Sequence, residues 1–128
     1  MIALAAVAML LFVAMAAFQA ALAAGAPLGA YVLGGRHRGV LPRPLRVASA
    51  IAAALLLAFA VIVLARSGAI QTPTGLEGLV QVGCWIVAGF LVLNTLANLA
   101  SKSRIERTLF AGMTGLLAVL AAAVALTG

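Results

Sequence analysis

Long apolar runs alternate with short polar segments along the chain. The runs cover about residues 2–24, 47–65, 76–99 and 105–126. Each is close to the roughly 20 residues that an α-helix needs to cross the ~30 Å hydrocarbon layer of a membrane. The pattern predicts an all-α membrane protein whose four transmembrane helices form a single bundle domain over residues 1–128.

Glycine and proline mark the predicted helix boundaries. Gly25 and Pro27 follow the first run, and helices commonly end at such residues. Pro44 comes just before the second run, where the first turn of a helix tolerates proline because the missing N–H would be unpaired there anyway. We therefore expect connections that are too short to fold as domains of their own.

The first run could also be a secretory signal peptide, because it contains Ala21-Leu22-Ala23 near its end. Signal peptides carry a positive N-terminal region and a shorter apolar core, whereas no Lys or Arg precedes Arg36 here. We expect the segment to be kept as a transmembrane helix.

Composition supports the same class of protein. Hydrophobic residues make up 66% of the chain, charged residues make up 8%, and the mean hydropathy is +1.29. Soluble domains have about half apolar and a quarter charged residues, and a chain of 128 residues could not bury this much apolar surface. An ordinary soluble domain is therefore excluded.

The basic residues lie almost entirely in two connections. The chain has 8 Lys and Arg against 2 Asp and Glu, a net charge of +6, and only Arg66 lies between the second and third runs. The other basic residues flank the connections between the first and second runs and between the third and fourth: Arg36, Arg38, Arg43, Arg46, Lys102, Arg104 and Arg107. The positive-inside rule then puts both connections in the cytoplasm and both termini outside.

This basic surface would face anionic lipid headgroups, so membrane lipids are the expected partners. Nucleic acid is not expected, because few aromatic residues accompany the basic ones. Small residues on the fourth run, Ala111 and Gly115 with Gly112 beside them and Val119 further along, form a narrow ridge that would allow close helix packing. Such packing could serve the bundle itself, a homo-oligomer or a partner in a membrane complex.

Both acidic residues match a helix-capping pattern. Thr74-x-x-Glu77 and Ser103-x-x-Glu106 each precede an apolar run, as in a capping box that satisfies the free N–H groups of a helix start. A proton-coupled transporter of the small drug-exporter type requires an acid buried within a span, and neither Glu77 nor Glu106 is so placed.

No catalytic or metal site is expected. Cys84 is the only cysteine and His37 the only histidine, so neither an intrachain redox pair nor a bis-histidine haem or His-rich metal site can form within one chain. Cys84 should lie toward the opposite leaflet from His37, which rules out a Cys–His dyad. We expect Cys84 to be a small buried apolar residue, and we expect no cofactor.

The glycine-rich segment from Gly25 to Arg46 permits two interpretations. It lacks the Lys and hydroxyl residue of a phosphate-binding P-loop, and no G-x-G-x-x-G occurs. It could be a structural turn at the membrane interface. Alternatively, Arg36, His37 and Arg38 on exposed glycine-rich backbone could hold a phosphate or carboxylate of a lipid or a soluble ligand.

Four polar residues lie within the runs at a similar depth, near the predicted cytoplasmic side: Gln19, Ser49, Asn94 and Asn98. Asn94 and Asn98 are spaced i, i+4 and so share one helix face. In hydrocarbon these groups must find partners and should point inward. They could join helices by hydrogen bonds or line a small cavity that opens to the cytoplasm.

Two sets of residues resemble a known group of proteins. Gly25-Ala26-Pro27-Leu28-Gly29, Gly34-Gly35, Gly39, Leu41-Pro42 and Arg46 form one set, and Asn94-Thr95, Asn98, Ser101-Lys102-Ser103 and Glu106-Arg107 form the other. Together they resemble a group of small uncharacterised bacterial four-helix integral membrane proteins. The resemblance covers most of the chain and implies the architecture, without implying an activity.

These observations favour a polytopic inner-membrane protein of non-enzymatic type, either structural and lipid-binding or an assembly partner, with a basic cytoplasmic face. The alternative is a small transporter or channel subunit that uses the polar cluster in the cytoplasmic half of the bundle. An intramembrane enzyme ranks third, because it would depend on Asn, Gln, Ser and Arg alone.

Overall fold

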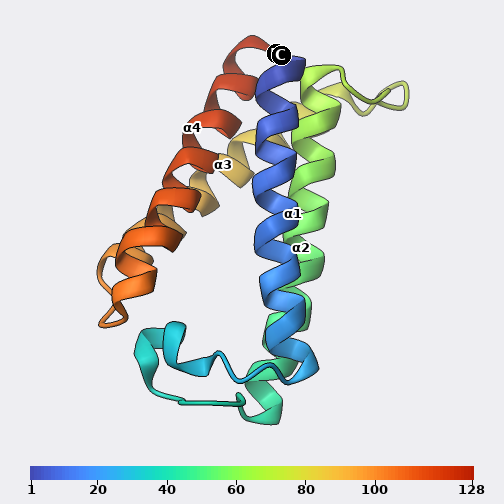
Figure 1. Cartoon of the computed structure of the whole chain (residues 1–128). Coiled ribbons are helices and arrows are strands. Elements are labelled where there is room, and N and C mark those ends of the chain that lie inside the picture. The colour runs from blue at the N-terminus through green and yellow to red at the C-terminus, as the bar shows by residue number, and fades with distance from the viewer.

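A computed structural model places every residue of the chain, 1–128, and contains helices and connections without strands. Four long helices succeed one another: α1 Ile2–Ala24, α2 Arg43–Ser67, α3 Glu77–Leu99 and α4 Ala111–Thr127 (Figure 1). Two short 3-10 turns, Gly29–Tyr31 and Leu33–Gly35, interrupt the first connection, and a π-helical turn, Glu106–Phe110, leads into α4. The four helices, counting the π-turn with the last, are long and apolar enough to cross a membrane, as the sequence predicts.

The helices are arranged as two hairpins, α1 with α2 and α3 with α4 (Figure 1). Both chain ends lie at one end of the bundle, where the Thr127 hydroxyl meets the Met1 sulfur. We call this the terminal end. The opposite end carries the connections of residues 25–42 and 100–103, and we call it the loop end. The hairpins come together toward the terminal end and diverge toward the loop end.

The main core fills the terminal half of the bundle. Its largest side chains are fully buried and come from all four helices: Phe12, Val63, Val87, Leu91, Leu117 and Val124. Ala5, Ala8 and Ala121 are 0% exposed, so small side chains let the helices approach closely there. Large apolar side chains also cover the outer surface, as lipid contact requires.

The helix boundaries follow local chemistry. Gly25 (φ 102°) ends α1 and Gly68 (φ 85°) ends α2, both in the left-handed conformation that glycine adopts without steric cost. Pro44 lies in the first turn of α2, as predicted. However, α2 begins at Arg43, several residues before the predicted start at residue 47, because its first turn carries Arg43 and Arg46 and so lies outside the apolar run from which the start was predicted.

Some local predictions are wrong. Neither capping box forms: Glu77 begins α3 itself and accepts a hydrogen bond from the Gly75 N–H (3.0 Å), while Glu106 bonds to the first connection. Both carboxylates accept hydrogen bonds from donors other than the N–H group of the expected N-cap residue. The small-residue ridge is also only partly used, because Val119 is 66% exposed, whereas Gly115 does lie against Thr95.

The first connection packs under the loop end as a folded segment (Figure 1). Val32 and Leu41 are buried together with Leu22 of α1, which fixes the segment to the bundle. Gly29 donates a hydrogen bond to the Gly39 carbonyl (2.8 Å), and a Cβ at Gly29 would lie 2.0 Å from the His37 carbonyl oxygen. Only glycine fits at position 29, because the backbone crosses itself there.

Candidate functional site

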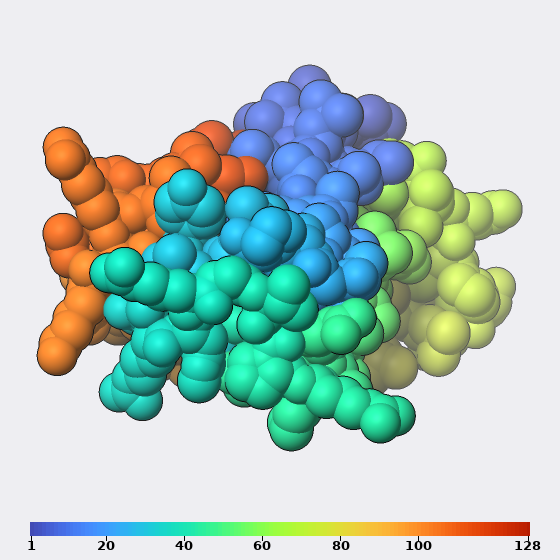
Figure 2. All heavy atoms as spheres, turned by 60° about the horizontal axis from the view of Figure 1, so that its bottom comes forward, coloured from blue at the N-terminus to red at the C-terminus, as the bar shows by residue number.

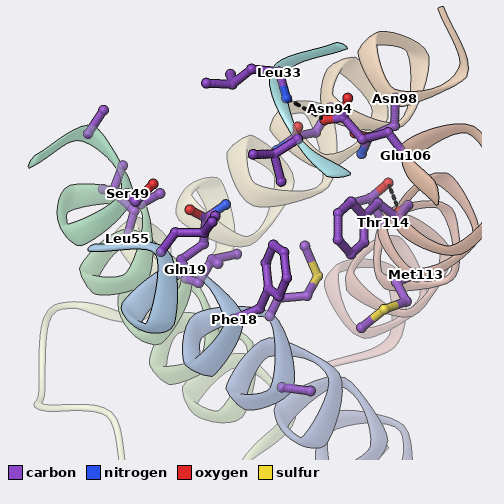
Figure 3. Close-up of a pocket in the computed structure, with 18 of the residues that line it drawn as sticks. Phe18, Gln19, Leu33, Ser49, Leu55, Asn94, Asn98, Glu106, Met113 and Thr114 are labelled. Carbon is purple, nitrogen blue, oxygen red and sulfur yellow. Dashed lines mark hydrogen bonds between the residues drawn. The ribbon is translucent and has the colours of Figure 1, made fainter. Parts of the chain in front are cut away.

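A cavity lies between the two hairpins in the loop-end half of the bundle (Figure 3). Its volume is about 480 Å³, within the range of small-molecule sites. Most of its lining is apolar. The polar lining residues are Gln19, Ser49, Asn94, Asn98, Glu106 and Thr114. The four polar residues that the sequence places at one depth therefore share one cavity.

These four residues face one another across the cavity. Figure 3 shows Gln19 from α1 and Ser49 from α2 on one side, with Asn94 and Asn98 from α3 on the other. None of the four side chains has a hydrogen-bond partner within the protein. The hydrogen bond that joins two helices at this level is instead between Thr95 and Thr114 (2.9 Å). Of the two alternatives for Gln19, Ser49, Asn94 and Asn98, the structure contains the cavity lining and not the hydrogen bonds between helices.

The cavity does not continue through the bundle. Its lining ends at Phe59 on α2 and Phe90 on α3, whose rings pack edge to face with centroids 5.2 Å apart. Phe59 also contacts Phe12 of the main core, at 6.4 Å between centroids. Beyond this aromatic layer lies the close-packed terminal half, so the cavity is a blind pocket.

The Glu106 carboxylate fastens the first connection to the start of the fourth helix. It accepts hydrogen bonds from the backbone N–H groups of Gly34 (2.9 Å) and Leu33 (3.2 Å) and from the Ser101 hydroxyl. We call these four residues the clasp. Next to it, the Ser103 hydroxyl donates to the Tyr31 carbonyl (3.0 Å). Because Leu33 and Glu106 both line the cavity, the clasp holds the connection across one of its walls.

The clasp also accounts for an unusual backbone conformation. Leu33 is the only non-glycine residue with a positive φ (51°), and Gly34 follows with a φ of 71°. Successive N–H groups in such a conformation form a concave donor site for an anion. The glycine-rich backbone therefore does hold a carboxylate, which belongs to Glu106 of the same chain.

Two of the basic side chains donate hydrogen bonds to backbone carbonyls at the end of a helix or just after it. The Arg46 Nε–H donates to the Ala23 carbonyl (3.0 Å) at the end of α1. Arg107 donates to the carbonyls of Ser101 (3.0 Å) and Lys102 (3.1 Å), just after α3. Basic side chains stabilise the unpaired carbonyls and the negative end of the dipole at a helix C-terminus, so these two positions are structural.

The side chains of the remaining basic residues of the loop end make no hydrogen bonds within the protein. Arg38, Lys102 and Arg104 line one depression of about 660 Å³, between the first connection and the start of the fourth helix. The backbone of Gly34 and Gly35 forms part of its floor. Figure 2 shows the two contributing segments side by side at the loop end. The other candidates, Arg36, His37 and Arg43, line neither this depression nor the cavity.

Sequence reasoning missed Thr95, Thr114 and the clasp. The threonines could have been found, since they are further polar residues within predicted spans. The role of Glu106 in holding the first connection could not have been found, because its local sequence pattern is that of a capping box. Cys84 is buried, as expected, and its thiol lies 3.5 Å from the Ala121 carbonyl. No group of three His, Cys, Asp or Glu residues is close enough to hold a metal ion.

Comparisons with protein-family models, curated proteins and solved structures found no match to this chain. The features of the chain that bear on its function are therefore the cavity, the clasp and the basic depression.

Proposed function

We propose that the chain is a non-enzymatic, multi-pass inner-membrane protein that binds anionic lipid headgroups at its loop end. The observation that carries this proposal is the depression formed by Arg38, Lys102 and Arg104. Their charges come from two segments that are far apart in the sequence, and no acidic residue lines the depression. The neighbouring Arg46 and Arg107 are engaged with helix ends. A phosphate group suits the three free cations, because charge-assisted hydrogen bonds are about twice as strong as neutral ones.

The proposal includes an orientation in which the loop end is cytoplasmic and both termini are outside. The distribution of the basic residues supports it, since only Arg66 lies at the terminal end, where its side chain donates to the Ala125 carbonyl (3.0 Å). Basic residues of the loop end would then lie against the anionic inner leaflet, each contributing on the order of 1 kcal/mol to attraction.

A reporter fused after Gly128 tests this orientation. We expect activity from a reporter that folds only outside the cytoplasm and none from one that works only in the cytoplasm, because seven positive charges resist transfer across the membrane. The same pair of reporters inserted at Thr74 should give the same result. Cytoplasmic activity at both positions would contradict the proposed orientation.

Lipid binding is tested by comparing two variants of equal charge. In Arg38→Gln/Arg104→Gln, we expect affinity for an anionic phospholipid to fall about 30-fold, from ~1 kcal/mol for each charge-assisted hydrogen bond lost at this exposed site. Arg36→Gln/Arg43→Gln should have a distinctly smaller effect, because these side chains lie outside the depression. The measurement is native mass spectrometry of the purified protein titrated with phosphatidylglycerol, with neutral phosphatidylcholine as the comparison.

Equal losses in the two variants would mean diffuse attraction and would contradict a defined headgroup site. Unchanged binding in both would contradict anionic lipid binding altogether. The binding should also weaken with added salt, which screens exposed charges beyond a Debye length of about 10 Å at 0.1 M.

A transporter or channel subunit is the second candidate, and the polar cavity is the observation that favours it. Passage across the membrane would require the Phe59–Phe90 layer and the packed core behind it to separate. The blind shape of the cavity is better suited to holding a molecule than to passing one.

A further inference from the structure

The cavity contains hydrogen-bonding groups that the protein leaves without partners. Asn94 lies five residues before Leu99, the last residue of α3, and so about 8 Å inside the helix at 1.5 Å per residue. Half of the hydrocarbon layer is about 15 Å thick, which puts Asn94 well within it. An unpaired amide at that depth costs several kcal/mol. Asn94, Gln19 and their neighbours therefore require a partner from outside the protein.

Part of the cavity wall belongs to exposed positions of the membrane-spanning segments. Leu55, Phe90 and Leu109 belong to its lining and are still 45%, 44% and 51% exposed, and all three lie within the membrane-spanning segments. A lipid chain could thus reach the cavity sideways without crossing water. Along α2 the lining extends from Leu45 to Phe59, about 21 Å at 1.5 Å per residue, so the space is long in the direction in which lipid chains lie.

The charge of the lining restricts the ligand. No basic side chain lines the cavity, and its one acidic side chain, Glu106, is already bonded to Leu33, Gly34 and Ser101. A charged group inside would have no countercharge in a medium of low dielectric constant. The amide groups of Gln19 and Asn94 can both donate and accept hydrogen bonds, which suits ester carbonyls and hydroxyls.

We propose that this cavity binds a neutral glycerolipid, with one acyl chain along α2 and its uncharged ester and glycerol groups hydrogen-bonded to Asn94, Asn98 and Gln19. The apolar lining holds the chain, and the polar residues select a lipid over a plain hydrocarbon. The site is separate from the basic depression and does not depend on the binding of anionic headgroups.

Photolabelling in nanodiscs tests the proposal. The probe is a monoacylglycerol that carries a diazirine in its acyl chain and a terminal alkyne, added to the whole protein in phosphatidylcholine nanodiscs. We expect labelled peptides to include the cavity-lining parts of α2 and α3. Asn94→Leu should reduce this labelling about 3- to 15-fold, the range that one or two hydrogen bonds within a membrane supply. Ala52→Phe, which fills the cavity, should nearly abolish it.

Matched controls separate the cavity from general membrane contact. Ala54→Phe introduces the same ring on the exposed surface of α2 and should label like the wild type. Arg38→Gln/Arg104→Gln should also label normally, so failure of headgroup binding and failure of this proposal give different results. Since Asn94 makes no side-chain hydrogen bond within the protein, Asn94→Leu should not lower the melting temperature below that of the wild type, and removal of the unpaired amide should raise it in lipid-free protein.

Equal labelling of wild type, Asn94→Leu and Ala52→Phe would overturn the proposal, because the probe would then be reacting from the surrounding bilayer. Competition by a long-chain alkane as effective as that by unlabelled monoacylglycerol would overturn the role of the polar residues. Reduced labelling in Asn94→Leu and Ala52→Phe, with Ala54→Phe unchanged, supports it.

Discussion

Replacing Glu106 with alanine is expected to release the first connection from the start of the fourth helix. The substitution removes the acceptor for the Leu33 and Gly34 N–H groups. Hydrogen bonds to charged groups contribute about 1.5–3 kcal/mol each, and partial exposure of Glu106 reduces this, so we expect a total of about 2 kcal/mol. Without the hydrogen bond to Glu106, Leu33 loses the contact that holds it in its left-handed conformation.

Limited trypsin digestion measures the release, because Arg36 and Arg38 lie directly after the clasp. A local opening that becomes ~2 kcal/mol easier raises the open population and the cleavage rate about 30-fold. Glu77→Ala is the matched control, since its hydrogen bond to Gly75 is local and distant from the loop end. Glu106→Gln should be intermediate, because its amide oxygen can still accept from one N–H group. Wild-type cleavage rates in Glu106→Ala would show that the clasp does not hold the connection.

Replacing Phe12 with alanine should cause the largest loss of stability. The Phe12 ring is 0% exposed and packs against Phe59 in the close-packed half of the bundle. Truncating a fully buried phenylalanine typically costs 3–5 kcal/mol, through lost contacts and the cavity left behind. Titration with a denaturing detergent, followed by circular dichroism, gives the change in the free energy of unfolding.

Phe18→Ala is the comparison for this effect. Phe18 lies six residues further along α1, lines the existing cavity and contacts Phe110 at 5.0 Å between ring centroids. Because its surroundings are already open on one side, the truncation should cost only about 1–2 kcal/mol. A cost for Phe18→Ala as large as that for Phe12→Ala would contradict the division of the bundle into a packed half and an open half.

The four helices could be predicted from the sequence because hydrocarbon thickness sets their length. Glycine at positions 25 and 68 and proline at 44 act through their own backbone preferences, which do not depend on tertiary structure. The start of α2 is harder to predict from the sequence, since Arg43 is polar yet helical. Hydropathy marks where a helix enters the hydrocarbon layer, which is a different point from where the helix begins.

The shared depth of Gln19, Ser49, Asn94 and Asn98 could likewise be inferred, because depth follows from residue counts along each helix. The hydrogen-bond partners of these side chains could not be inferred from the sequence. Whether they meet one another or face a space depends on how far the hairpins diverge, which is a property of the tertiary structure.

The two glutamates show the limit of local patterns. Thr74-x-x-Glu77 and Ser103-x-x-Glu106 are alike in sequence, yet only Glu106 reaches a distant segment. The difference lies in Leu33 and Gly34, whose N–H groups are 72 or 73 residues away along the chain. Similarly, Arg46 and Arg38 look equivalent by charge, but only the helix end beside Arg46 gives it a fixed partner.

The separation between the two sides of the clasp also sets an order of events during synthesis. Gly34 leaves the ribosome 72 residues before Glu106, and at about 5–20 residues per second this is a delay of roughly 4 to 14 s. By then α1, α2 and α3 have all been made, whereas the Arg46–Ala23 bond joins α1 and α2 at a separation of only 23 residues. The contacts within the first hairpin can thus form early, whereas its connection is fixed only after Glu106 has been synthesised. A nascent chain stalled before residue 106 would carry an inserted first hairpin with an open connection, which makes the final helix the part that completes the cytoplasmic surface in the proposed orientation.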